Sequence, residues 1–133
     1  MIIRANSITP EVTSIMHKLE EVVKTNDTLP LNIDDHIVLL PQKDIIMFEV
    51  SGTTMTIHTN GGVYQLKAQL KRTLTKLSDT NFVQISKNTV INLHYLDMLE
   101  TSFSGNMMAK LTDSNRALVS RKYLPELKKH LGM

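Results

Sequence analysis

Apolar and polar side chains alternate with a period of two through much of the chain after residue 35, and this pattern predicts strands. Two turn signals, Ser51-Gly52 and Asn60-Gly61-Gly62, enclose an alternating segment at 54–59. Two turns so close together are typical of a β-meander. Further strand patterns occur at 36–41, 44–50, 82–93, 96–103, 107–113 and 116–121. The sequence therefore predicts a mainly β body over residues 36–133.

The first 35 residues predict a separate strand-helix extension. The opening MIIRANS is short and apolar at its start, as in a strand. Thr9-Pro10-Glu11 is typical of a helix start, with a threonine N-cap and proline at the first helical position. Apolar side chains at spacings of three and four from Val12 to Val23 then predict an amphipathic helix over 9–25. The polar segment 25–35, which contains Pro30, is interpreted as a linker, so we predict two units, 1–35 and 36–133.

Two short helices are expected inside the β body. Leu66, Leu70, Leu74 and Leu77 share one helix face, with lysine and arginine on the others. The last twelve residues, KYLPELKKHLGM, predict a terminal helix. Its inward face should carry Leu124, Leu127 and Leu131, and Gly132 should end it.

Composition narrows the class of protein. The 133 residues include no cysteine, so disulfide and thiolate chemistry are excluded. No apolar run approaches the roughly 18 residues of a membrane span, and no signal-peptide pattern opens the chain, so we expect a soluble cytoplasmic protein. The net charge of +2 is uneven: residues 1–35 hold 3 basic and 6 acidic side chains, whereas residues 36–133 hold 12 and 7. A basic body is compatible with a polyanionic partner.

Residues that could carry catalysis are not grouped in the sequence. The five histidines are scattered one per predicted element, without the spacing of a metal site. Phosphate-binding loops, dinucleotide fingerprints and nucleophile elbows are absent. The eight methionines are more typical of core filler than of a binding face. We therefore expect neither an enzyme nor a cofactor or metal, and no small-molecule substrate.

Polar and basic residues instead gather at three predicted turns. Arginine and lysine can reach guanine acceptors or phosphates, asparagine can pair with adenine, and hydroxyl groups can serve either. Each group can also be explained as an ordinary solvated turn. Ser120 could in addition cap the terminal helix. The candidate binding residues are Ser86, Lys87 and Asn88, then Ser120, Arg121 and Lys122, and finally Gly52 and Thr53.

These segments resemble a known family. The chain is similar to the LytTR-type DNA-binding domains of bacterial transcription regulators over the segment FVQISKNTVINLHYLDML, the hairpin that follows, and the segment ALVSRKYLPELKKHL. The resemblance covers about residues 36–131, and its most specific points are Ser120-Arg121 and the asparagine after Val90-Ile91. The matching positions are Phe82, Ile85, Lys87, Asn88, Asn92, Leu96, Ser120 and Arg121.

The resemblance implies both a fold and a function. The fold is mainly β (α+β), with elongated stacked antiparallel sheets and a few short helices. The function is sequence-specific binding of double-stranded DNA, read in the major groove through loops that contain Gly52-Thr53, Lys87-Asn88 and Arg121. The chain resembles a compact subgroup without a receiver domain, in which a small membrane protein can restrain the regulator.

Other interpretations remain open at the level of sequence. The apolar stripe of the predicted 9–25 helix could pair two copies as a homodimer on DNA, or pack on the chain's own β body. It could also make the chain a protein-interaction module to which DNA binding is incidental. A single-stranded RNA binder is disfavoured, because three phenylalanines, three tyrosines and no tryptophan provide few stacking surfaces.

Overall fold

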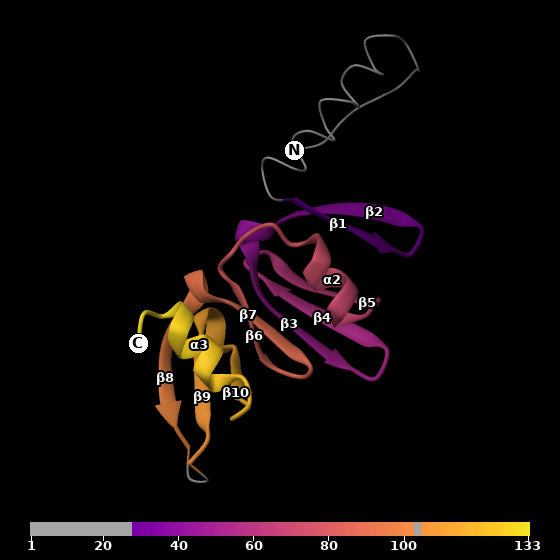
Figure 1. The fold of residues 1–133 in the computed structure, drawn as a ribbon. Helices are drawn as coiled ribbons and strands as arrows, with labels where there is room; N and C mark the ends of the chain where they lie inside the picture. The colour runs from indigo at the N-terminus through magenta and orange to yellow at the C-terminus, as the bar shows by residue number, and fades with distance from the viewer. Residues whose placement is uncertain (1–27, 103–104) are drawn as a thin grey trace.

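The computed structural model describes residues 28–102 and 105–133, and these form three antiparallel sheets with short helices between them. The sheets follow one another along the molecule (Figure 1). The mainly β fold expected from the sequence is confirmed. The first sheet contains β1 (Thr28–Ile33) and β2 (His36–Pro41). The second sheet contains β3 (Ile45–Ser51), β4 (Thr54–Thr59), β5 (Gly62–Lys67), β6 (Phe82–Ser86) and β7 (Thr89–Asn92). The third sheet contains β8 (Leu96–Thr101), β9 (Met107–Leu111) and β10 (Arg116–Val119).

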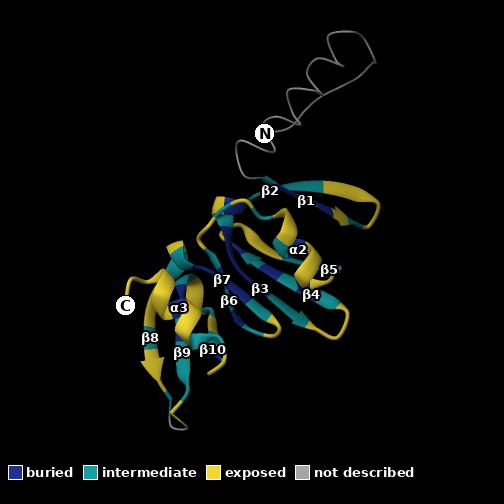
Figure 2. Cartoon of the chain, viewed as in Figure 1, coloured by how far each residue is buried: buried dark blue, intermediate teal, exposed yellow. Residues whose placement is uncertain are grey.

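The five-stranded sheet has the order β5-β4-β3-β7-β6 and combines two local motifs. The predicted meander is present as β3-β4-β5, and β6 and β7 form a hairpin. Alternation along β4 buries Met55, Ile57 and Thr59, as the sequence pattern indicates. In the β3–β4 turn Gly52 has a φ of 62°, a left-handed conformation that glycine adopts without strain. Figure 2 shows that the buried residues concentrate in the central strands.

The strand β1 corrects the linker interpretation. Residues 28–33 form a regular antiparallel ladder with β2, and Leu29 and Leu31 are buried against the same core cluster as Phe48. Leu29 and Leu31 bury one face of β1, whereas Pro30 and Asn32 on the other face are exposed. The predicted strand and helix over residues 1–27 lie outside the described residues. The division into units 1–35 and 36–133 therefore stays a prediction.

The first helix of the body is shorter than the leucine spacing predicts. Helix α2 spans Leu70–Lys76, whereas Leu66 belongs to β5 and pairs with Met55 of β4. The leucine period continues across the strand–helix boundary because both elements face the same core. The buried side chain of Gln42 accepts hydrogen bonds from the backbone N–H groups of Ser78 (3.2 Å) and Asp79 (3.1 Å), which fixes the segment after α2.

A second core cluster joins the three-stranded sheet, β6, β7 and the terminal helix α3 (Leu124–His130). Leu127 is fully buried in it, and Gly132, with a φ of 78°, ends the helix as predicted. The inward position predicted for Leu131 is wrong: it lies at the C-cap with 38% of its surface exposed. The cap predicted at Ser120 is also wrong, because the N-cap is Tyr123 and the Ser120 carbonyl accepts from the Tyr123 and Leu124 N–H groups.

Asn92, a specific point of the family resemblance, is a buried structural residue. Only 1% of its surface is exposed. Its side-chain amide donates to the carbonyl of Ile45 at 2.9 Å and accepts from the His94 N–H at 3.0 Å. It thus ties the start of β3 to the end of β7. A buried amide that satisfies two backbone groups explains the asparagine without any contact to a ligand.

Replacing Asn92 should therefore reduce stability. We expect Asn92→Ala to lower the free energy of unfolding by about 1–3 kcal/mol, because buried backbone groups lose their partners. Asn32→Ala, at an exposed asparagine of β1, should change it by less than about 0.5 kcal/mol. Urea denaturation of both variants measures the difference. Equal stability of the two variants would contradict a structural role for Asn92.

Candidate nucleic-acid interface

Two of the three candidate loops lie side by side at one end of the five-stranded sheet (Figure 1). Strands β3 and β7 are antiparallel neighbours, and their last ladder pair is Glu49 with Thr89. The backbone N–H of Val50 also donates to the Asn88 carbonyl at 2.9 Å. The pairing brings the β3–β4 turn, with Gly52-Thr53, beside the β6–β7 turn, with Lys87-Asn88. All four of these residues are exposed.

The third candidate loop is held at the same end of the sheet. After β10, the backbone N–H of Ser120 donates to the Ile85 carbonyl at 2.8 Å, so this junction lies against the end of β6. Arg121 and Lys122 follow and are both exposed. The Lys122 ammonium lies 5.9 Å from the centre of the Tyr123 ring. The structure thus brings together three groups that are far apart in the sequence.

The β6–β7 turn is shaped by its own side chains. The hydroxyl of Ser86 accepts from the Asn88 N–H at 3.3 Å, and the Gln84 amide donates to the Lys87 carbonyl at 3.4 Å. The register between β6 and β7 shifts between Gln84 and Ser86, which is an irregularity at the hairpin tip. Ser86 is half-buried and holds the turn, whereas Lys87 and Asn88 extend from it.

The cations of these loops are not neutralised within the part of the chain that the structure describes. The ion pairs there join His58 with Glu49, Lys110 with Glu100 and His130 with Glu126. Lys87 and Arg121 take part in none of them. Exposed cations that hold no carboxylate can engage phosphate or base-edge oxygen atoms at little cost.

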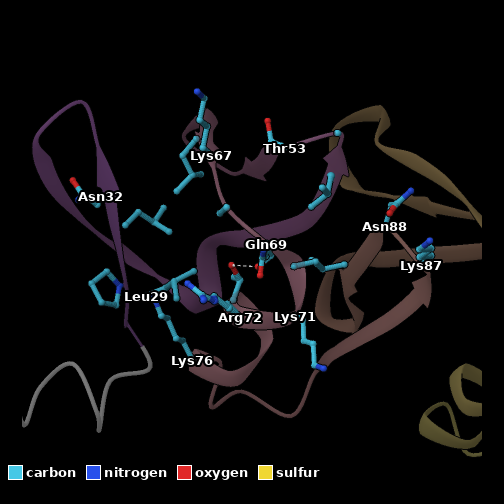
Figure 3. Close-up of a pocket in the computed structure, with 18 residues that line it drawn as sticks. Leu29, Asn32, Thr53, Lys67, Gln69, Lys71, Arg72, Lys76, Lys87 and Asn88 are labelled. Atoms are coloured by element: carbon cyan, nitrogen blue, oxygen red, sulfur yellow. Dashed lines mark hydrogen bonds between the residues drawn. The ribbon is translucent and has the colours of Figure 1, made fainter.

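A basic groove adjoins these loops and was not predicted. It has a volume of about 730 Å³ and lies between β1 and α2 (Figure 3). Gly52, Thr53, Lys87 and Asn88 line one part of it. The sequence signal for this groove is the density of cations over residues 67–76, which by itself is equally typical of a solvated helix face. The remaining cations that line the groove are Lys67, Lys71, Arg72 and Lys76.

The arrangement provides groups that can recognise a ligand. Exposed cations, an amide and a hydroxyl project from adjacent turns of a rigid sheet. Within residues 28–102 and 105–133, no group of three or more histidine, aspartate or glutamate side chains could hold a metal ion. In the same residues no helix is long and apolar enough to cross a membrane. Such a surface can contact a polyanion and read polar groups between its charges.

Comparisons with known proteins agree with this description. A family model described as LytTr DNA-binding domain matches residues 35–132. An uncharacterized HTH-type transcriptional regulator of Staphylococcus aureus strain NCTC 8325 is 29% identical over 131 residues, which cover 98% of this chain and 88% of that protein. The transcriptional regulatory protein LytR of strain N315 is also 29% identical, over 108 residues. That match covers 81% of this chain but 44% of LytR, so the chain spans less than half of that relative.

A solved structure supports the fold. The LytTr DNA-binding domain of a methyl-accepting/DNA response regulator from Bacillus cereus superposes with a TM-score of 0.70. The match covers 80% of this chain and 98% of that one, at 15% identity. At this identity the likeness concerns the stacked antiparallel sheets and not individual side chains.

Proposed function

Because the chain belongs to the LytTr DNA-binding domain family, we propose that it is a transcription regulator that binds double-stranded DNA sequence-specifically. It reads the major groove through the three loops that contain Gly52-Thr53, Lys87-Asn88 and Ser120-Arg121-Lys122. The family consists of DNA-binding domains, which supports a role in binding rather than in catalysis. The protein acts in the cytoplasm, where its DNA is found.

The observation that carries this proposal is the convergence of the three loops at one end of one sheet. The Arg121 guanidinium can donate two hydrogen bonds to a guanine, and the Asn88 amide can pair with an adenine. Lys87 can reach a base or a phosphate, and the Thr53 hydroxyl can serve either. A rigid sheet that holds these groups together gives them a fixed spacing, which sequence discrimination requires.

We propose further that two copies bind one duplex. A single module buries only about 600–1,000 Å² on DNA, which limits its specificity. Two copies separated by one helical turn, roughly 10.5 bp, would present the same loops to the same side of the duplex. The predicted 9–25 helix would pair them, and the acidic N-terminal unit would be the docking face for a small membrane protein that restrains the regulator. Residues 1–27 of this unit, which include the predicted helix, lie outside the described part of the chain.

Selection of bound duplexes from a random pool tests the function. We expect a short motif to be enriched, repeated at a spacing of roughly 10.5 bp. Binding to the selected duplex should weaken steeply with salt, because Lys and Arg contacts release counterions. If the 9–25 helix binds a protein and DNA binding is incidental, the selection should enrich no motif. Equal affinity for every duplex, or stronger binding to single-stranded RNA, would contradict the proposal.

A further inference from the structure

The basic groove carries an inference beyond the three loops. Its lining includes five cations and no acidic residue. They are exposed, and the ion pairs of the described residues include none of them. Figure 3 shows Lys67 with Thr53 along one rim, Lys71 and Lys76 along the opposite rim, and Lys87 with Asn88 at one end. Cations on both rims and at one end of a groove favour an anionic occupant.

The floor of the groove is apolar. It is formed largely by side chains of the core, and Leu29, Leu31 and Leu70 have only 0%, 5% and 8% of their surfaces exposed. The charged and polar side chains stand on the rim around it, and their positive charge suits an extended polyanion.

The groove is continuous with the candidate DNA interface. Lys67, at the end of β5, is the ladder partner of Thr54, and the Ala68 N–H donates to the Thr53 carbonyl at 3.3 Å. The rim thus begins where the β3–β4 turn ends. At the other side Lys71 lies in the first turn of α2, which starts three residues after β5. An anionic strand that leaves the loops would pass between these two lysines.

We propose that the basic groove holds the sugar-phosphate backbone of the DNA that flanks the bases read by the loops, with Lys67 and Lys71 as its phosphate contacts. This inference rests on the proposed function. The contacts are independent of base sequence, so the groove contributes affinity and register while the loops contribute discrimination. The bound duplex therefore extends beyond the bases that determine specificity.

The double variant Lys67→Gln/Lys71→Gln tests this role. We expect it to weaken binding to the selected duplex and to a scrambled duplex by the same factor. The slope of log affinity against log salt should fall by about two, roughly one for each phosphate contact. Its matched control is Lys128→Gln/Lys129→Gln, which removes two exposed cations from the last turn of α3. The control should leave both the slope and the discrimination near their wild-type values.

Duplex length separates this inference from the proposed function. On a duplex trimmed to the selected bases, the double variant should bind as tightly as the wild-type protein. If the wild-type protein binds specifically but the double variant behaves like the control, the groove proposal is overturned and the proposed function stands. Absence of specific duplex binding by the wild-type protein would overturn both.

Sodium tripolyphosphate distinguishes the backbone from a small anion. If the groove holds DNA backbone and no small anion, millimolar tripolyphosphate should compete with duplex binding by the wild-type protein no better than with duplex binding by the Lys67→Gln/Lys71→Gln variant. The opposite result would be saturable tripolyphosphate binding that requires Lys67 and Lys71, together with duplex binding that does not depend on flanking DNA. That result would assign the groove to a small polyphosphate and overturn the proposal.

Discussion

Arg121→Ala should weaken binding to the selected duplex by about 1–3 kcal/mol, and the upper value corresponds to a change in affinity of about a hundredfold. Binding to a scrambled duplex should change little. Arg121 is exposed, follows the residue whose backbone is hydrogen-bonded to β6, and takes part in no ion pair in the described part of the chain. Its loss removes a bidentate contact that a methyl group cannot replace. Titration of both duplexes at one salt concentration measures the change in discrimination.

The control for this variant is Arg116→Ala, at an exposed arginine of β10. Arg116 begins β10, whereas Arg121 follows its end, so the two lie at opposite ends of the strand. We expect Arg116→Ala to preserve discrimination between the two duplexes. If both variants discriminate like the wild-type protein, with folding confirmed, the assignment of Arg121 as a base contact fails.

The largest expected effect on stability is at Leu29. We expect Leu29→Ala to lower the free energy of unfolding by about 2–5 kcal/mol, because it removes a fully buried side chain and leaves a cavity. Leu29 packs in the same cluster as Ile45, Phe48 and Ile57, so strand β1 is part of the core. Chemical denaturation followed by circular dichroism measures the change.

Ile37→Ala is the matched control, since Ile37 lies on the paired strand β2 but is 72% exposed. Its effect should stay within about 0.5 kcal/mol. A Leu29→Ala variant as stable as this control would show that residues 28–33 do not belong to the folded body, as the linker interpretation supposed.

The strands could be predicted because their signals are local. Alternation along β4 and the turns at Ser51-Gly52 and Asn60-Gly61-Gly62 specify the meander within a few residues. Strand β1 was missed for the same reason: Asn26, Asp27 and Pro30 give the segment the composition of a linker. The alternate leucines were visible, but their burial depends on the core formed by β3 and β4, which lies elsewhere in the chain.

The candidate site was only partly predictable. The residue types at each loop indicated binding, but their convergence depends on the pairing of β3 with β7 and on the contact of Ser120 with β6. Neither contact has a signal in a single sequence. The family resemblance supplied the three loops together. It did not supply the basic groove, which forms only when β1 and α2 face one another.

The most direct test of the account is methylation interference on the selected duplex. Methylation at guanine N7 places a methyl group in the major groove, whereas methylation at adenine N3 places it in the minor groove. We predict that guanine N7 methylation blocks binding within the motif and that adenine N3 methylation does not. The Arg121→Ala variant should lose interference at one guanine. Interference at adenine N3 alone, or an Arg121→Ala pattern identical to that of the wild-type protein, would contradict it.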